Sequence, residues 1–208
     1  MVASGLREMR LKRKAIGFTL LELLITLAVV AIIVSIGAPS LSGGLNDSRL
    51  RTSANSLQGA LSAARSTAVA KGVVVTVCKS TTSQTCASGS DWAEGWIVFV
   101  DKGTIGVVDA EDADLSSGTA SDQRILVQQG LGESVAVKAE SNTGGGLNYV
   151  SFQPNGFTRN ANGQFQSGTF LFCDERGDSA GAKRRVVRID AAGASRVSDP
   201  LEGESCPI

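Results

Sequence analysis

Residues 17–39 read GFTLLELLITLAVVAIIVSIGAP. A helix over residues 18–38 would be about 32 Å long, which matches the hydrocarbon thickness of a bilayer. The sequence therefore predicts one membrane crossing, from Phe18 to Ala38. An acid, Glu22, stands near the start of this span, where a buried charge costs roughly 3 kcal/mol or more. The carboxylate needs a compensating partner.

The residues before the span are strongly basic. Residues 1–16 contain five basic side chains and one acid, for a net charge of +4. The positive-inside rule holds such a segment in the cytoplasm. The chain after Pro39 is therefore expected on the far side of the membrane.

Two simple interpretations of this start are a cleaved secretory signal and a plain signal anchor. A secretory signal has roughly 7 to 15 apolar residues and then a small-residue cleavage site. The present run is longer and carries Glu22 in its first turn. A plain anchor explains the length and the basic flank, but it gives no role to Glu22 or to the Gly17-Phe18 step.

The segment GFTLLELL (residues 17–24) resembles the class III leader junction of type IV pilins and pseudopilins. The resemblance implies that a prepilin peptidase cuts after Gly17 and methylates the new N-terminus, Phe18. It also implies that Glu22 meets the N-terminal amine of a neighbouring subunit during filament assembly, and such a charge favours the ionised acid. Pro39 resembles the helix-kinking proline at the membrane exit of that family.

This resemblance implies three parts: a leader peptide (1–17), a transmembrane and assembly helix (18–38) and a periplasmic pilin-like globular domain (39–208). The protein would be a single-pass inner-membrane protein with a cytoplasmic N-terminus, and it would lie in a filament or at its tip after assembly. The whole chain has 20 basic and 20 acidic residues, and removal of the leader leaves 15 and 19. A net charge of −4 predicts no general attraction to nucleic acid.

The composition argues against an enzyme. Histidine is absent, which removes the commonest general base, the usual Ser-His triad and most zinc sites. We therefore expect no catalytic residue, no cofactor and no metal.

The four cysteines are Cys78, Cys86, Cys173 and Cys206. In an exported domain, an even number of cysteines favours disulfides, and three pairings are possible. We favour Cys78 with Cys86, which would close a short loop, and Cys173 with Cys206, which would fasten the tail to a strand. Other pairings and free buried thiols are the alternatives.

After Pro39 the apolar residues recur at helical spacing, at Leu50, Ala54, Leu57, Leu61, Ala64 and Ala68. The pattern predicts an amphipathic helix that ends near Gly72 and is capped by Asn46, Asp47 or Ser48. Its solvated face would carry Arg49, Arg51 and Arg65.

Beyond Gly72 the sequence predicts short strands separated by Gly, Asn, Asp and Ser, at 73–78, 96–101, 124–129, 134–140, 148–154, 168–174 and 184–190. A long helix followed only by strands predicts an α+β fold, with the helix packed on antiparallel sheets.

Several of these stretches resemble the GspH/FimT family of pseudopilins and minor pilins: ARSTAVAKGV (64–73), GWIVFVD (95–101), FQPNGF (152–157), FCD (172–174) and the strand and turn at 188–193. The resemblance implies a structural subunit that helps to initiate or cap a type IV pilus or a type II secretion pseudopilus. Its implied partners are the prepilin peptidase, other minor and major pilins or pseudopilins, an inner-membrane assembly platform and the lipid bilayer.

The segment after Asp101 loosely matches a calcium loop through Gly106 and Asp109. Gly103 and Ile105 stand where oxygen ligands are needed, so we expect a solvated loop rather than a calcium site. Just before the strand at 96–101, Trp92 and Trp96 are expected to pack in the core or at an edge rather than to stack on bases.

A basic stretch near the C-terminus, formed by Lys183, Arg184, Arg185, Arg188 and Arg196, is the candidate for DNA contact. Some members of the family are DNA receptors with closely spaced arginines after a glycine. Here Gly193 is followed by a single arginine, Arg196. A solvated or subunit-facing strand edge is therefore favoured, and a minor pilin that binds DNA during uptake is the alternative function.

Overall fold

The computed structural model describes residues 17–89, 91–109, 122–132, 134–142, 144–179 and 182–206, with all of their side chains except those of residues 36–42. The chain divides into two compact units, Met1–Ser42 and Gly43–Ile208. Helix α1 (Leu20–Lys71) contributes residues to both units.

In the first unit, α1 begins at Leu20 after the non-helical residues 17–19. Every described side chain from residue 17 to residue 35 is exposed. Among the side chains that the structure describes, no helix combines the length and the apolar character needed to cross a membrane. The predicted span over 18–38 includes residues 36–38, whose side chains lie outside the described ones, so this crossing stays a prediction.

In the second unit, α1 buries the predicted apolar stripe. Leu50, Leu57 and Leu61 are at most 1% exposed, and the small alanines between them let the helix lie close to the sheets. The helix ends where Gly72 adopts a φ of +67°, and its N–H donates to the carbonyl of Ala68 at 2.9 Å. Both the stripe and the glycine stop agree with the sequence analysis.

One expectation about this helix was wrong. No cap forms at residues 46–48, because α1 runs through them without a break and the Asp47 carboxylate instead bonds to Arg176 at 2.7 Å. Arg49 and Arg51 are exposed as expected, but Arg65 is half-buried. Its guanidinium reaches the carbonyl of Ala192 at 2.8 Å, because the turn that contains Ala192 packs beside the helix.

The strands are β1 (Val75–Lys79), β2 (Gly95–Val100), β3 (Gln123–Gln129), β4 (Val135–Ser141), β5 (Tyr149–Phe152), β6 (Gly168–Asp174), β7 (Arg185–Ile189) and β8 (Ser195–Ser198). All seven predicted strands occur, with ends within two residues of the expected ones. The sequence analysis missed β8 and the short 3₁₀ helix η1 (Trp92–Glu94), since neither shows a clear apolar period.

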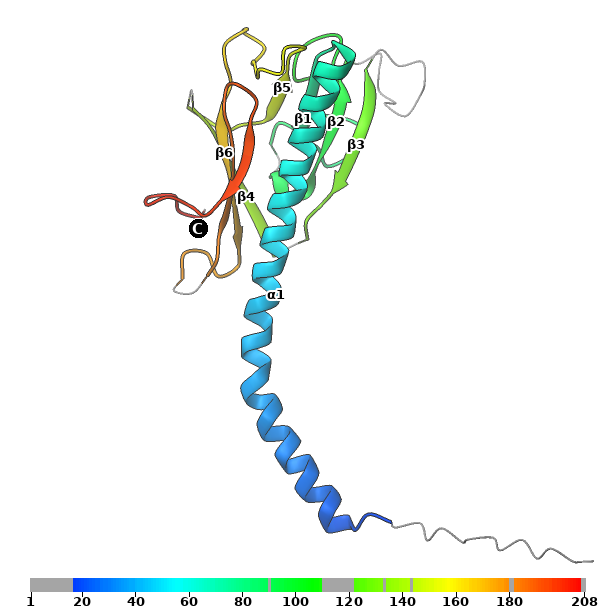
Figure 1. Cartoon of the computed structure of the whole chain (residues 1–208), viewed down its shortest axis with the longest axis vertical. Coiled ribbons are helices and arrows are strands. Elements are labelled where there is room, and N and C mark those ends of the chain that lie inside the picture. The colour runs from blue at the N-terminus through cyan, green and yellow to red at the C-terminus, as the bar shows by residue number, and fades with distance from the viewer. Residues whose placement is uncertain are drawn as a thin grey trace, which may run out of the picture. The chain divides into compact units, whose positions relative to one another are not determined.

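The strands form two antiparallel sheets, ordered β3-β2-β1-β5 and β4-β6-β7-β8. Figure 1 shows both sheets beside the C-terminal part of α1. One apolar core joins the helix stripe to side chains of both sheets, such as Val77 and Phe152 from the first and Phe170 and Val187 from the second. The predicted α+β fold, a long N-terminal helix with antiparallel sheets, is therefore confirmed.

The two tryptophans lie in this core, as predicted. Trp92 and Trp96 are 2% and 0% exposed. The indole N–H of Trp92 donates to the carbonyl of Leu147 at 2.6 Å, and its ring meets the edge of Phe170 with ring centroids 4.9 Å apart. Trp92 thus links η1 to the second sheet.

Candidate functional site

The predicted leader junction lies at the start of α1. Gly17 and Phe18 precede the helix, and the Phe18 side chain is 82% exposed. Residues 1–16, which hold the basic flank, lie outside the described residues. The structure therefore shows an accessible peptide bond between Gly17 and Phe18, and its cleavage stays a prediction.

Thr19 caps the helix at this junction. Its hydroxyl accepts from the N–H of Glu22 at 3.2 Å, and its carbonyl accepts from the N–H of Leu23 at 3.1 Å. Glu22 follows Thr19 by three residues, the spacing of a capping box, and stands in the first helical turn, where the helix dipole favours a negative charge. This T-x-x-E pattern is visible in the sequence but was not among the predicted helix caps. The dipole gives Glu22 a local compensation besides the expected neighbouring amine.

Pro39 lies within α1, and the helix continues through it. Its side chain is outside the described ones, so the kink expected at Pro39 stays a prediction. Gly17, Phe18 and Glu22 come from the first unit, whereas the basic stretch and the disulfides belong to the second.

Four of the five residues in the basic stretch are paired with acids. The ammonium of Lys183 lies 3.4 Å from Asp47, and the guanidinium of Arg184 lies 2.6 Å from Asp178. Arg185 pairs with Asp199, and Arg188 pairs with Glu204 at 2.6 Å. The positive charge predicted from the sequence is therefore locally neutralised, which leaves little of it to attract phosphate.

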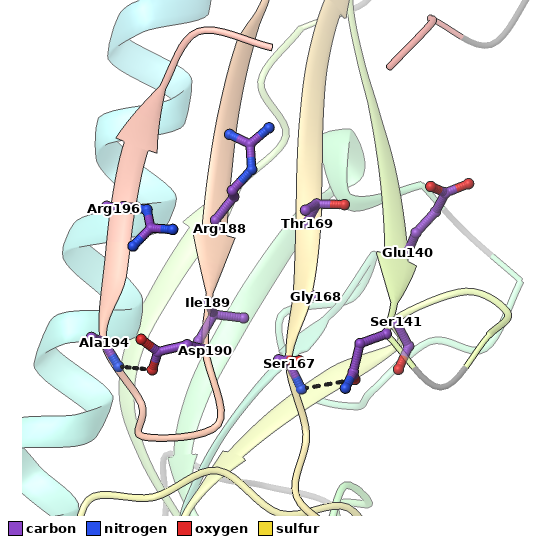
Figure 2. Close-up of a pocket in the computed structure, with 11 residues that line it drawn as sticks. Glu140, Ser141, Ser167, Gly168, Thr169, Arg188, Ile189, Asp190, Ala194 and Arg196 are labelled. Carbon is purple, nitrogen blue, oxygen red and sulfur yellow. Dashed lines mark hydrogen bonds between the residues drawn. The ribbon is translucent and has the colours of Figure 1, made fainter. Parts of the chain in front are cut away.

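Arg196 is exposed, and within the described ranges it forms no ion pair. It lies directly opposite Arg188 on the neighbouring strand, as Figure 2 shows. Both arginines line a shallow depression of about 340 Å³ that Glu140, Thr169 and Asp190 also line. A single uncompensated arginine is a weak basis for nucleic-acid binding, which relies on several cations.

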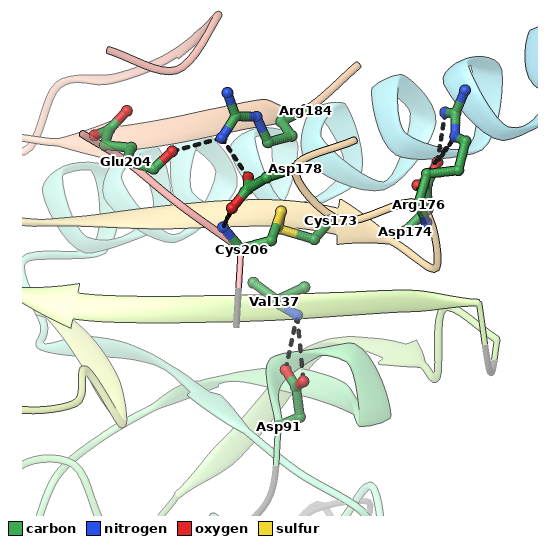
Figure 3. Close-up of a disulfide and its surroundings, with 9 residues drawn as sticks. All are labelled: Asp91, Val137, Cys173, Asp174, Arg176, Asp178, Arg184, Glu204 and Cys206. Atoms are coloured by element: carbon green, nitrogen blue, oxygen red, sulfur yellow. Dashed lines mark hydrogen bonds and ion pairs between the residues drawn. A yellow bond between two sulfur atoms is a disulfide. The ribbon is translucent and has the colours of Figure 1, made fainter. Parts of the chain in front are cut away.

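The cysteines form the disulfides Cys78–Cys86 and Cys173–Cys206, the pairing favoured from the sequence. Cys206 packs with Leu171, Cys173 and Val186 in a small apolar cluster separate from the main core. The backbone N–H of Cys206 donates to the Asp178 carboxylate at 3.2 Å, and Arg184 also bonds to the Glu204 carbonyl at 2.7 Å (Figure 3). Residues 199–206 thus form a strap that supplies the acids paired with Arg185 and Arg188.

A second ionic cluster ties α1 to the turn after β6. Arg176 bonds to Asp174 at 2.5 Å and to Asp47 at 2.7 Å. The bond to Arg176 holds the pKa of Asp47 below its usual value, and the two acids raise the pKa of Arg176. No pattern in the sequence indicated Arg176, since its partners come from distant segments.

Asp101, the last residue of the strand predicted at 96–101, is buried. It is 3% exposed, and its Oδ2 accepts from the Thr76 hydroxyl at 2.6 Å and from the Gly106 N–H at 2.9 Å. Burial raises the pKa of Asp101 to about 6, although the Thr76 bond opposes this change. Asp101 therefore anchors the turn at 102–106 to β1, while residues 102–104 of that turn are exposed.

This geometry does not support a calcium site in the segment after Asp101. Over the described ranges, which end at residue 109 and resume at 122, no three acidic or cysteine side chains are grouped so that they could hold a metal ion. The fully buried Asp122 instead accepts from the backbone N–H of Lys102 at 2.9 Å. Glu111, Asp112 and Asp114 lie outside the described residues.

Asp91 joins the two sheets. Its Oδ1 accepts from the N–H of Ala93 in η1 at 3.0 Å and from the N–H of Val137 in β4 at 3.1 Å (Figure 3). The Asp91 carboxylate thus accepts from a backbone N–H at the edge of the second sheet, and that N–H is then not available to pair with another chain.

The profile of the type II transport protein GspH matches residues 53–193, and the prokaryotic N-terminal methylation motif matches residues 12–38. No curated protein matches the chain.

Two solved structures illustrate the similarity. The type IV minor pilin FimU of Pseudomonas aeruginosa is 18% identical to this chain. The aligned region covers 76% of this chain and 92% of the FimU chain, with a TM-score of 0.47. The minor pseudopilin EpsH from the type 2 secretion system of Vibrio cholerae is 12% identical to this chain. The aligned region covers 75% of this chain and 99% of the EpsH chain, with a TM-score of 0.43. Because the GspH profile matches more than half of the sequence, the chain belongs to the GspH family of type II transport proteins.

Proposed function

We propose that this chain is a minor pilin or pseudopilin, a structural subunit that helps to initiate or cap a type IV pilus or a type II secretion pseudopilus. The observation that carries the proposal is the junction at Gly17 and Phe18. There a short non-helical segment precedes the Thr19 cap, Glu22 lies in the first turn of α1, and the N-terminal methylation motif matches across them.

The proposal assigns a role to each part of the chain. Residues 1–17 are the leader that a prepilin peptidase removes, residues 18–38 anchor the protein in the inner membrane, and residues 39–208 form the periplasmic domain. Pro39 kinks the helix where it leaves the bilayer. The N-terminus of the precursor is cytoplasmic, because the basic flank remains on that side.

The partners in this proposal are other minor and major pilins or pseudopilins and the inner-membrane assembly platform. Glu22 pairs with the methylated N-terminal amine of a neighbouring subunit as that subunit leaves the bilayer. The two disulfides of the second unit suit an oxidising compartment such as the periplasm. The proposal gives no residue a catalytic role.

The alternative, a DNA receptor, is not favoured by the charge arrangement. Lys183, Arg184, Arg185 and Arg188 each have a carboxylate partner, so a DNA phosphate would have to displace an existing ion pair. Among the described residues at this face, Arg196 and Arg51 present exposed guanidinium groups without an ion pair, and Arg51 lines a depression with Arg184 and Arg185.

The test is the mass of the mature protein isolated from cells. We expect a chain that begins with N-methylated Phe18, because the Gly17–Phe18 bond lies between the basic flank and the helix. A product that starts near Ser40, or an uncut chain in cells with active prepilin peptidase, would contradict the proposal. Deletion of the gene would then separate the two systems, since loss of surface filaments indicates a pilus and loss of protein export indicates a secretion pseudopilus.

A further inference from the structure

The second unit displays a pair of phenylalanines on its surface. Four of its phenylalanines, at 99, 152, 170 and 172, are fully buried. Phe157 and Phe165 are 40% and 49% exposed, and their ring centroids lie only 5.8 Å apart. Single exposed apolar residues are ordinary, but adjacent aromatic rings on a surface are typical of an interaction site.

A hydrogen-bonded hairpin over residues 159–165 carries Phe165, and Phe157 lies two residues before this hairpin. The Asn160 side-chain oxygen accepts from the N–H groups of Asn162 and Gln164, both at 3.0 Å, and the N–H of Ala161 donates to the Tyr149 hydroxyl at 2.9 Å. Just before the hairpin, Thr158 is fully buried, and its hydroxyl bonds to the carbonyl of Gln166. The backbone that carries the rings is thus fixed by hydrogen bonds, which lowers the ordering cost of association.

Arg159 belongs to the same surface. Its guanidinium lies 4.3 Å from the centroid of the Phe165 ring, a cation–π contact, and it donates to the carbonyl of Gly163. Aromatic and arginine side chains are the residue types that contribute most to protein interfaces.

A groove of about 600 Å³ lies where the last turns of α1 approach the turn at 155–156, which precedes Phe157, and the turn at 193–195. Val69, which is 54% exposed, and Arg65 line it together with small residues. A side chain at Gly156 would come within 3.4 Å of both Val69 and Arg65, so the turn that leads into Phe157 lies against these two residues. In Figure 1 the yellow loops lie at the end of the sheets where α1 ends.

The charge of this surface is unbalanced. Arg65 and Arg159 bond to backbone carbonyls, and across the described residues neither forms an ion pair, unlike Arg176, Arg184 and Arg188. Of the described residues that line the groove, Arg65 alone is charged. The nearest turn has one acid, Asp190, whose carboxylate accepts from the Ala194 N–H. A partner that completes this surface must therefore supply a carboxylate as well as an apolar side chain.

We propose that the hairpin surface, defined by Arg65, Val69, Phe157, Arg159 and Phe165, is the docking site for a neighbouring pilin-like subunit that presents an apolar side chain beside a carboxylate. The apolar group packs against Phe157 and Phe165, and the carboxylate pairs with Arg159 or Arg65. This inference rests on the proposed function, because it takes the partner from the same filament.

The test uses the full-length protein in its native cells, with the photo-crosslinking residue p-benzoylphenylalanine at position 165. We expect an adduct with another processed pilin-like subunit, identified by mass spectrometry. The matched control carries the same residue at position 201, since Leu201 is 65% exposed on the C-terminal strap. Equal adducts from both positions, an adduct only with lipid, or an adduct only with a second copy of this chain would overturn the proposal.

A second arm tests the chemistry of the surface. Phe157→Ala with Phe165→Ala should reduce the crosslinked or co-purified subunit by about tenfold, since aromatic anchors carry much of the binding energy of an interface. Arg159→Glu should give a similar loss, whereas Arg51→Glu, on an exposed arginine of α1, should give none. Thermal unfolding checks that each variant is folded. If both hairpin variants crosslink to or co-purify with the same amount of partner subunit as the wild type, the inference is contradicted.

The two proposals fail in different ways. If the chain is no filament subunit, the wild-type protein is not cut after Gly17 and is absent from sheared filaments and the assembly complex. If only the docking site is wrong, the wild-type protein is cut and assembled, and the double phenylalanine variant assembles equally well.

Discussion

Asp101 makes the stability of the second unit depend on pH. Its carboxyl is 3% exposed, and burial raises its pKa from 3.8 to about 6. The folded state therefore holds the proton more tightly than the unfolded state, so the contribution of Asp101 to stability is greatest below pH 3.8 and falls as the pH rises through 6. A difference of about two pKa units, at about 1.36 kcal/mol each, amounts to about 3 kcal/mol lost by pH 8.

The substitution Asp101→Asn isolates this effect. Asparagine keeps an oxygen that can accept from Thr76 and Gly106, but it does not ionise. The Oδ1 atom of Asp101 has no hydrogen-bond partner, and in the variant the amide nitrogen occupies its position. The protonated acid would also place a hydrogen-bond donor there, so asparagine resembles the protonated form. Near pH 4 the variant and the wild type should be about equally stable, and at pH 8 the variant should be more stable by up to about 3 kcal/mol.

Tryptophan fluorescence during thermal unfolding of the full-length protein in detergent measures this difference. The chain has two tryptophans, and both are buried in the second unit, so the signal reports on that unit. For a unit of this size, 3 kcal/mol corresponds to about 6–12 °C in Tm. Glu202→Gln, at an exposed acid, is the control. A difference between Asp101→Asn and wild type that stays constant from pH 4.5 to pH 8 would refute the reasoning.

Three other outcomes are expected. Replacing Cys173 and Cys206 by alanine should cost about 3–4 kcal/mol of stability, because their disulfide closes a loop with a sequence separation of 33, and unchanged unfolding in denaturant would contradict this. Arg176→Ala should lower stability by about 1–2 kcal/mol in the same assay, since it leaves Asp174 buried without its partner, and Arg176→Lys should recover part of the loss. Glu22→Ala should leave membrane insertion and cleavage intact but reduce incorporation into sheared filaments, and undiminished incorporation would show that the acid has no pairing role there.

Local sequence patterns were sufficient for most of the fold. The stripe of leucines and alanines from Leu50 to Ala68 identified the buried face of α1, because helical spacing alone decides which side chains share a face. Short apolar runs bounded by turn residues identified seven strands, because both features are local in the sequence. The strand β8 was missed because its four residues, SRVS, become a strand by pairing with β7 rather than by their own pattern.

The N-terminal junction could also be identified from the sequence. Gly17, Phe18 and Glu22 are contiguous, and their meaning depends on spacing along one chain rather than on distant contacts. Even there, the Thr19 cap was available in the sequence as T-x-x-E, and the structure shows that it closes the helix start.

The sequence by itself thus determined the α+β class, the helix stripe, most strands and the N-terminal methylation motif, since these depend on periodicity and on neighbours in the chain. Only the tertiary structure decided the state of the charges. Arg188 and Glu204 lie 16 residues apart and Arg176 and Asp47 lie 129 apart, so a basic stretch in the sequence became a set of neutral pairs in space. The burial of Asp101 could not be predicted from the sequence either. The solvation of a carboxyl depends on the groups that pack around it, and the whole fold sets those groups.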